Sequence, residues 1–139
     1  MNREVLLGID IGEHYIGLAL NDPATTLVFP LPVLKRESDE ETLEKLSQII
    51  EDHKVSKIII GLPTHHAEGV LKFARKLSQK TVLSIDYVDE SLTTQKARDL
   101  MLLTKKKKER QKMRDDSLAA AFILEEYLGY TETRSGLLE

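Results

Sequence analysis

Two apolar runs lie close together near the start of the chain, and they restrict the possible folds more than any other feature. Residues 4–11 and Tyr15–Leu20 both have strand-like patterns, and a glycine and two polar residues separate them. So short a connection predicts an antiparallel hairpin, because parallel strands need a long crossover. Asp10 lies inside the first run, where an unpaired buried carboxylate is costly. Its charge therefore requires a partner, a turn or a metal ion.

The rest of the chain alternates strands and helices. Residues 27–34 form a predicted edge strand, because Pro30 and Pro32 cannot donate to a strand ladder. The apolar run 57–61 is typical of a central parallel strand covered on both faces. The other predicted elements are helices at Ser38–Asp52, 67–79, Thr93–Leu103 and Asp116–Leu128 and a strand at Thr81–Val88. This order predicts an α/β fold in which an antiparallel meander continues into parallel crossover units.

Helical spacing also predicts which residues of the helix at 67–79 are buried. The predicted buried set is Val70, Leu71, Ala74 and Leu77.

Composition excludes several classes of protein. A chain of 139 residues is expected to form one domain, here residues 1–130, followed by a flexible polar tail at 131–139. Without cysteine there is neither a disulfide framework nor thiolate chemistry. No signal-peptide pattern follows Met1, and no apolar run approaches the roughly 20 residues of a membrane span. We therefore expect a cytoplasmic protein without a membrane partner.

A basic segment stands out against the net charge of −3. Residues 105–114 contain seven of the twenty lysines and arginines and a single acidic residue. Such a run is either a solvated segment or a surface for the phosphates of a nucleic acid, and its position directly before Asp115 and Asp116 favours the second. The predicted nucleic-acid-binding residues are Lys105, Lys106, Lys107, Lys108, Arg110, Lys112 and Arg114.

Carboxylates occur at the ends of three predicted elements. Asp10 is in the first strand, Asp89 and Glu90 close the fifth strand, and Asp115 and Asp116 open the last helix. Singly, each has an ordinary explanation as a turn anchor, a strand end or a helix cap. Together at one end of the sheet they would repel one another, and a divalent cation removes that repulsion. Oxygen ligands suit Mg²⁺ or Mn²⁺, and two such ions activate water and stabilise the leaving oxygen of a phosphodiester.

Glycines surround the first carboxylate. Gly12 is expected to take a left-handed turn conformation, and Gly17 to allow close backbone approach within a strand. A strand, an aspartate and a glycine hairpin also resemble the phosphate-binding hairpin of sugar kinases and actin-like ATPases, which predicts nucleotide binding instead. Those proteins need two such domains. The glycines predicted to shape structural loops are Gly8, Gly12, Gly17 and Gly61.

Two adjacent histidines, His65 and His66, follow the central strand. They are expected to be exposed, because no cysteine or third histidine lies at the spacing of a zinc site.

Four motifs resemble the YqgF (RuvX) family of Holliday junction resolvases, which is linked to maturation of the 5′ end of 16S ribosomal RNA. They are GIDIGEHYIGLALND (8–22), GLP (61–63), DESLTT (89–94) and DDSLAAAFIL (115–124), in order along nearly the whole chain. The resemblance implies a ribonuclease H-like fold, with a five-stranded mixed sheet and helices on both faces. It also implies a divalent-metal endonuclease in which Asp10, Glu90 and Asp116 are the catalytic metal ligands, with Asp89 as an additional candidate.

This resemblance implies RNA processing in ribosome assembly as the preferred role. Resolution of DNA junctions is the enzymatic alternative, and because it requires two symmetric cuts it would need a homodimer rather than a monomer. A non-catalytic nucleic-acid-binding module is the alternative from a different class.

Four positions depart from the family pattern. His14 and Tyr15 replace a basic pair, Ser91 replaces an arginine, Asn21 replaces a serine, and the loop at 64–68 is short. Basic groups beside such a site normally contact phosphate or stabilise transition-state charge. Their loss predicts weaker catalysis, for which the basic run at 105–114 is a possible compensation.

Overall fold

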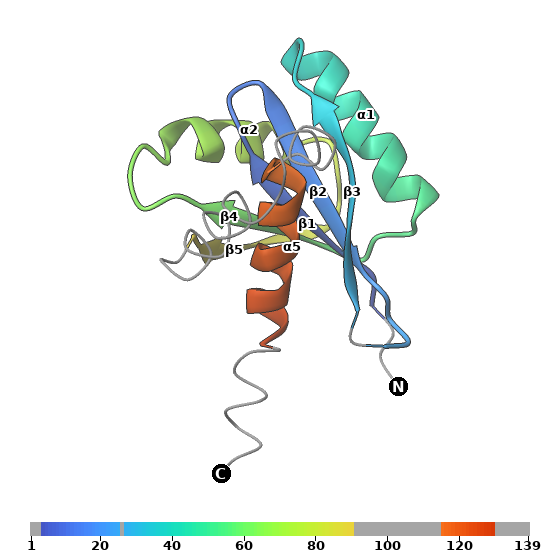
Figure 1. Ribbon diagram of the computed structural model, residues 1–139. Coiled ribbons are helices and arrows are strands. Elements are labelled where there is room, and N and C mark those ends of the chain that lie inside the picture. Colours follow the sequence, from blue (N-terminus) through green and yellow to red (C-terminus); the bar gives the residue numbers. More distant parts are fainter. Residues whose placement is uncertain (1–3, 26, 91–114, 130–139) are drawn as a thin grey trace.

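The N-terminal hairpin predicted from the sequence begins the sheet. The computed structural model describes residues 4–25, 27–90 and 115–129. Strand β1 (Leu6–Ile11) pairs antiparallel with β2 (Tyr15–Asn21), which in turn pairs antiparallel with β3 (Val28–Lys35). The sheet order is β3-β2-β1-β4-β5, so β3 is an edge strand, as its prolines predicted (Figure 1).

The last two strands run parallel to β1. Strand β4 (Lys57–Leu62) pairs with β1 on one side and with β5 (Ser84–Asp89) on the other. The central position predicted for β4 is therefore confirmed. Because these three strands are parallel, their carboxyl ends lie along one edge of the sheet, here called the carboxyl edge.

Strand β5 starts three residues later than the predicted Thr81. The Thr81 hydroxyl accepts a hydrogen bond from the Leu83 backbone N–H at 3.2 Å. This local turn keeps the chain out of the ladder until Ser84.

Helices cover both faces of the sheet, as expected for this fold class (Figure 1). On one face, α1 (Asp39–Asp52) and α2 (Glu68–Ser78) pack over the larger apolar cluster. On the other face, α5 (Asp115–Leu128) packs over a smaller cluster that includes Leu6 and Ile59. The predicted helix at Thr93–Leu103 lies outside the described residues.

Helix α1 begins where its capping residue predicted. The Ser38 hydroxyl accepts a hydrogen bond from the Glu41 backbone N–H at 3.1 Å.

One predicted buried position of α2 is wrong. Leu71 is 36% exposed, whereas Phe73 is buried together with Val70, Ala74 and Leu77. The buried face follows the spacing i, i+3, i+4, i+7 from Val70, and that spacing selects Phe73 and leaves Leu71 at the rim.

Two of the predicted structural glycines let α5 lie directly on the sheet. A Cβ atom at Gly8 would lie 2.9 Å from the Ala120 carbonyl oxygen, and one at Gly61 would collide with the side chain of Ile123. Real Cβ atoms do not approach so closely, and the obstacle at Gly8 is helix backbone, so Gly8 requires glycine while α5 keeps this position. At Gly61 the obstacle is the flexible end of the Ile123 side chain, which can move. Both glycines lie within strands, β1 and β4, so the loop role predicted for them is wrong.

The left-handed conformation predicted for Gly12 is wrong. In the described part of the chain, the residues with positive φ are Lys54, His66 and Gly129. The turn after β1 instead closes through the Gly12 backbone N–H, which donates to the Tyr15 carbonyl oxygen at 2.9 Å. None of the described helices is long and apolar enough to cross a membrane.

Candidate functional site

Asp10 lies on the face of the sheet that α5 covers. Side chains alternate along β1, and Leu6 and Gly8 both meet α5, so the alternation places Asp10 on the same face. The residue is 8% exposed and lies one position before the end of the strand. Gly17 is its partner across the hairpin, and because it lacks a side chain it leaves space beside the carboxylate.

The two carboxylates at the end of β5 point to opposite faces. Asp86 and Val88 contact α5 or its apolar cluster. The Glu90 backbone N–H donates to the Leu62 carbonyl oxygen at 2.7 Å, which extends the parallel ladder by one residue. Alternation therefore places Glu90 on the α5 face with Asp10, and Asp89 on the face covered by α2.

The first turn of α5 is anchored by a buried serine that the motif analysis did not single out. The Ser117 hydroxyl donates to the Leu31 carbonyl oxygen at 2.8 Å and accepts weakly from the Leu18 backbone N–H at 3.5 Å. This serine is 1% exposed, so its two backbone contacts fix the helix start against β2 and β3.

The other end of α5 is held near the start of the parallel strands. The Tyr127 hydroxyl donates to an Asp86 carboxylate oxygen at 2.6 Å, and the Lys57 ammonium lies 3.4 Å from the same oxygen. The Tyr127 hydroxyl and Lys57 lower the pKa of Asp86, against a smaller opposing effect of burial. Helix α5 therefore runs antiparallel to β1, β4 and β5, and it starts at the carboxyl edge.

The structure thus brings together the backbones of the three predicted acidic segments. Asp10, Glu90 and the first residues of α5, Asp115 and Asp116, all belong to the carboxyl edge on the α5 face. The side chains of Asp115 and Asp116 lie outside the described residues. Among the described side chains, no three histidines or carboxylates are grouped closely enough to hold a metal ion, so the predicted site depends on Asp116.

Arg36 fixes the hairpin that follows Asp10, and no sequence motif had indicated it. Its guanidinium donates to the Gly12 carbonyl oxygen at 3.0 Å and lies 3.6 Å from Asp39 and 4.8 Å from the centre of the Phe73 ring. These contacts connect the hairpin to α1 and α2. The signal in the sequence is a basic residue with an acid three positions later, and it is a weak one.

Asp39 also accepts a hydrogen bond from the Lys76 ammonium, at 2.8 Å. This bond is the main reason why the pKa of Asp39 is lowered; burial opposes it, and the charge of Arg36 adds to it.

The residues that depart from the family pattern differ in their burial and contacts. Asn21 is buried, and its side chain accepts from the Leu6 backbone N–H at 2.6 Å and donates to the Glu4 carbonyl oxygen at 3.2 Å. It therefore secures the start of β1. His14 is exposed at the hairpin tip, 4.0 Å from Glu13. Ser91 and the predicted nucleic-acid-binding residues at 105–114 lie outside the described residues.

His65 and His66 are exposed, as predicted.

Comparison with known proteins places the chain among relatives of the same length. A family model named RuvX and described as Holliday junction resolvase matches residues 4–130. The chain belongs to the RuvX family. Two RuvX relatives, from Natranaerobius thermophilus and Dehalococcoides mccartyi, are 35% and 36% identical over 130 and 128 residues. The alignments cover 88% and 87% of this chain and 92% and 95% of the relatives, and both are named “Putative pre-16S rRNA nuclease”.

Solved structures establish the fold of this RuvX chain. The Thermus thermophilus RuvC structure, in complex with a Holliday junction substrate, gives a TM-score of 0.56 at 12% identity and covers 93% of this chain and 96% of RuvC. The fowlpox virus Holliday junction resolvase gives 0.54 at 14% identity, over 93% and 98% of the two chains. The predicted ribonuclease H-like fold, with its five-stranded mixed sheet, is confirmed.

Proposed function

We propose that this RuvX chain is a metal-dependent endonuclease that matures the 5′ end of precursor 16S ribosomal RNA. The observation that supports it best is the register of β1 and β5, which sets Asp10 and Glu90 on one face of the carboxyl edge where α5 also begins. The curated relatives described above carry a name that specifies this substrate. Such a substrate places the protein in the cytoplasm.

The acidic donor set fits the metal ions that the family implies. Asp10, Glu90 and Asp116 would hold Mg²⁺ or Mn²⁺, since hard cations of this kind prefer carboxylate oxygens. Bound there, the ions would supply activation of water and neutralisation of the phosphodiester's developing charge. Asp89 faces away from this group, so we leave it out of the ligand set.

The chain's own residues contribute position and charge. Strand β1 pairs with β2 at Asp10 itself and with β4 as far as Ile9, and Arg36 fixes the turn that follows Asp10. A pre-positioned ligand needs no rearrangement during the reaction, which lowers its barrier. Residues 105–114 would hold the phosphates on either side of the cleaved bond, in a manner that does not depend on RNA sequence.

Resolution of Holliday junction DNA is the second candidate. Its support is the description of the family model and the likeness in fold to two resolvases. This function would require a homodimer, because a junction is resolved by two symmetric cuts.

Cleavage assays on both substrates test the proposal. A 5′-labelled RNA spanning the mature 16S 5′ end and a labelled four-way DNA junction are each incubated with Mn²⁺ or with EDTA. We expect Mn²⁺-dependent cleavage of the RNA that falls by about 10²–10³-fold in Asp10→Asn, the scale of losing one electrostatic contact to the transition state.

Three results would contradict this proposal. Cleavage that persists in EDTA would exclude the metal site. Faster cutting of the junction than of the RNA would favour the resolvase alternative. Binding of both substrates without cleavage of either would leave a non-catalytic binding module.

A further inference from the structure

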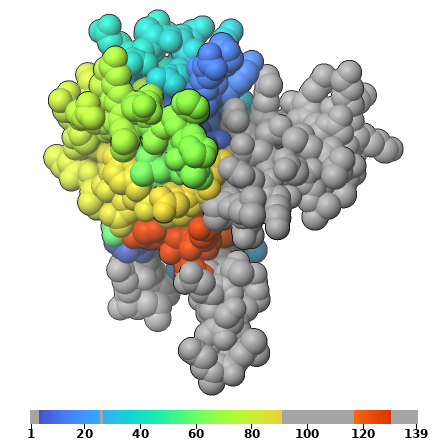
Figure 2. Space-filling view, turned by 90° about the vertical axis from the view of Figure 1, so that its left-hand side faces the viewer, coloured from blue at the N-terminus to red at the C-terminus, as the bar shows by residue number. Residues whose placement is uncertain are grey.

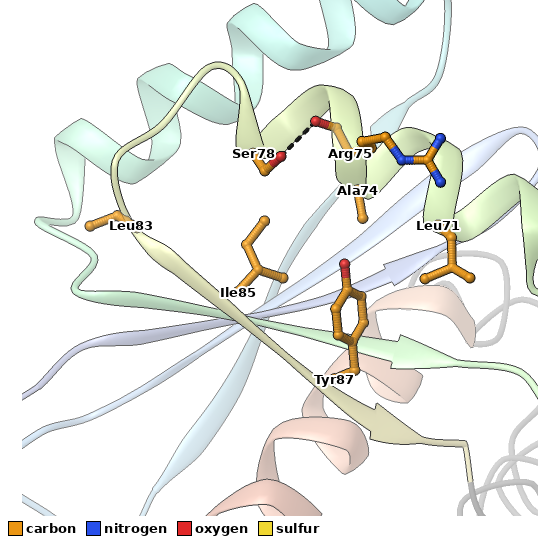
Figure 3. Close-up of a pocket in the computed structure, with 7 residues that line it drawn as sticks. All are labelled: Leu71, Ala74, Arg75, Ser78, Leu83, Ile85 and Tyr87. Carbon is orange, nitrogen blue, oxygen red and sulfur yellow. Dashed lines mark hydrogen bonds between the residues drawn. The ribbon is translucent and has the colours of Figure 1, made fainter.

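A pocket of about 370 Å³ lies between α2 and β5, on the face of the sheet opposite to Asp10. Figure 2 shows α2 and β5 next to each other on one side of the molecule. The residues that line the pocket are Leu71, Ala74, Arg75, Ser78, Leu83, Ile85 and Tyr87 (Figure 3). Its size is within the range of small-ligand sites.

The pocket combines an apolar floor with an aromatic ring. Ala74 is fully buried, and Leu83 and Ile85 are partly buried against the larger apolar cluster. The Tyr87 ring rises from β5 toward α2 and is 43% exposed (Figure 3). A flat, half-exposed ring beside apolar walls is the type of surface on which unpaired bases stack.

The pocket also carries a cation, Arg75, that pairs with none of the described residues. The Arg75 side chain has no hydrogen bond or ion pair with any residue that the structure describes; the Ser78 hydroxyl donates, at 2.7 Å, to its backbone carbonyl oxygen. Tyr87 likewise has no hydrogen-bond partner for its hydroxyl within the described ranges. Both polar groups are available to a ligand that carries negative charge next to an apolar or aromatic part.

Basic residues on the surface of α2 beside the pocket could bind further phosphates of a polyanion. The exposed surface of α2 carries Lys72 and Arg75, with Lys80 just beyond the helix end, and none of the three is paired with a described carboxylate; its one exposed acid is Glu68. The exposed face of α1 is acidic instead, with Glu40, Glu41, Glu44, Glu51 and Asp52. Of the two helices on this side of the sheet, α2 is therefore the one suited to a phosphate backbone.

We propose that this pocket binds one unpaired nucleotide of an RNA strand, with its base against Tyr87 and its phosphate at Arg75. The inference rests on the proposed function for its choice of RNA. Tyr87 and Glu90 belong to one extended segment and are three residues apart, about 10 Å at the rise of a strand. Among the described strands, β5 pairs only with β4, so an RNA strand that passes the outer side of β5 would contact both the pocket and the carboxyl edge.

Binding without cleavage tests the pocket by itself. The probe is a fluorescein-labelled single-stranded octaribonucleotide, titrated by anisotropy in EDTA so that metal-dependent cleavage is prevented. Tyr87→Ala should weaken binding by about tenfold, the scale of losing one stacked base, while Tyr87→Phe retains the ring and should bind within about twofold of wild type.

Charge substitutions give the second arm of the experiment. Arg75→Gln should weaken binding and lower the slope of log affinity against log salt by about one, as expected for the loss of one phosphate contact. Lys45→Gln, at an exposed position of α1, is the matched control and should leave both quantities unchanged. Tyr87 and Arg75 both lie at the surface, so we expect each variant to fold. A thermal unfolding transition measured for each variant checks this.

Several results would overturn the proposal. Equal affinity of Tyr87→Ala and wild type would remove the pocket from the RNA path, even if RNA cleavage by Tyr87→Ala continues and so supports the proposed function. Equal binding of the corresponding DNA octamer, with the same response to Tyr87→Ala, would overturn the choice of RNA. Amide shifts at β5 and α2 caused by an acidic nonapeptide, but not by RNA, would assign the pocket to a protein partner. Conversely, the protein could bind RNA in a way that depends on Tyr87 and yet cleave neither substrate. That result would support the proposed nucleotide pocket and contradict the proposed nuclease function.

Discussion

At the scale of single residues, the register of β5 distinguishes two neighbouring acids that the sequence leaves equivalent. Asp89 and Glu90 adjoin one another at the end of β5, and the sequence motif predicts that both lie near a metal. The hydrogen bond from Glu90 to Leu62 continues the ladder and thereby sets Glu90 on the face of Asp10. Neighbouring residues on a strand face opposite ways, so adjacent carboxylates cannot have the same role here.

This difference predicts unequal effects of two conservative substitutions. Glu90→Gln should lower the rate of Mn²⁺-dependent RNA cleavage by about 10²-fold or more, because it removes a charged group from the catalytic edge. Asp89→Asn should change the rate by less than about threefold, because its side chain faces α2. Single-turnover cleavage with saturating enzyme measures both. A larger loss in Asp89→Asn than in Glu90→Gln would reverse the assignment of faces.

Part of the site was accessible from the sequence because its residues lie in recognisable local patterns. Asp10 interrupts an apolar strand, and Glu90 and Asp116 come at the ends of elements. Ser117 and Arg36 were missed because their importance depends on contacts with segments distant in the chain, Leu31 and Gly12. No periodicity or spacing reports such contacts.

At the scale of elements, α5 depends on glycines beneath it. Gly8 and Gly61 lie in adjacent strands: Gly8 lets the helix backbone come close to the sheet, and Gly61 leaves room for the Ile123 side chain. The sequence predicted a loop role for both glycines, yet Gly8 acts through packing within a strand instead. The sequence could not reveal this, because it does not show which helix covers which strand.

Replacing Gly8 should therefore destabilise the fold. Gly8→Ala would bring a methyl group to 2.9 Å from the Ala120 carbonyl oxygen, and overpacking of this kind costs about 1–3 kcal/mol in the free energy of unfolding. Gly69→Ala is the matched control: a Cβ there meets nothing within 4 Å, and the residue lies in α2, so stability should rise by about 0.5–1 kcal/mol. Urea unfolding measures both variants. An unchanged stability of Gly8→Ala would mean that α5 can move away freely.

The contact between α1 and α2 should make stability depend on pH. Asp39 has a lowered pKa in the folded state, chiefly because of Lys76, so folding favours its charged form. Its contribution is full well above the ordinary value of 3.8 and is lost as the pH falls through the lower folded-state pKa. Stability should thus decline in acid below about pH 5, and Asp39→Asn should reduce that decline.

Glu40→Gln is the control for this measurement, because it removes an exposed acid from the same first turn of α1. Urea unfolding midpoints between about pH 3 and pH 7 compare the three proteins, at low enough salt for the ion pairs to act. An acid decline in Asp39→Asn as steep as in wild type would show that the pair with Lys76 contributes nothing. Asp86, whose pKa is also lowered, accounts for part of the decline that remains.

At the scale of the whole molecule, one sheet separates the two faces for which we propose functions. The α5 face carries Asp10 and Glu90, while the opposite face carries the pocket at Tyr87 and the basic surface of α2. The fold class, the edge position of β3 and the central position of β4 followed from local patterns, namely the order of the elements, the two prolines of β3 and the continuous apolar run of β4. The structure was needed to show which side chains lie on which face of the sheet and in which register the strands pair. Both depend on contacts between elements that are distant in the chain.

The central claim is that three separate segments bind a divalent ion on the α5 face of the carboxyl edge. Titration of ¹⁵N-labelled protein with Mn²⁺ tests it most directly, because a bound paramagnetic ion broadens the amide resonances around it. We predict selective broadening at Asp10, Glu90 and Ser117 that disappears in Asp10→Asn while the remaining spectrum stays folded. Broadening that is absent at these amides, or that persists unchanged in Asp10→Asn, would contradict the proposed metal site.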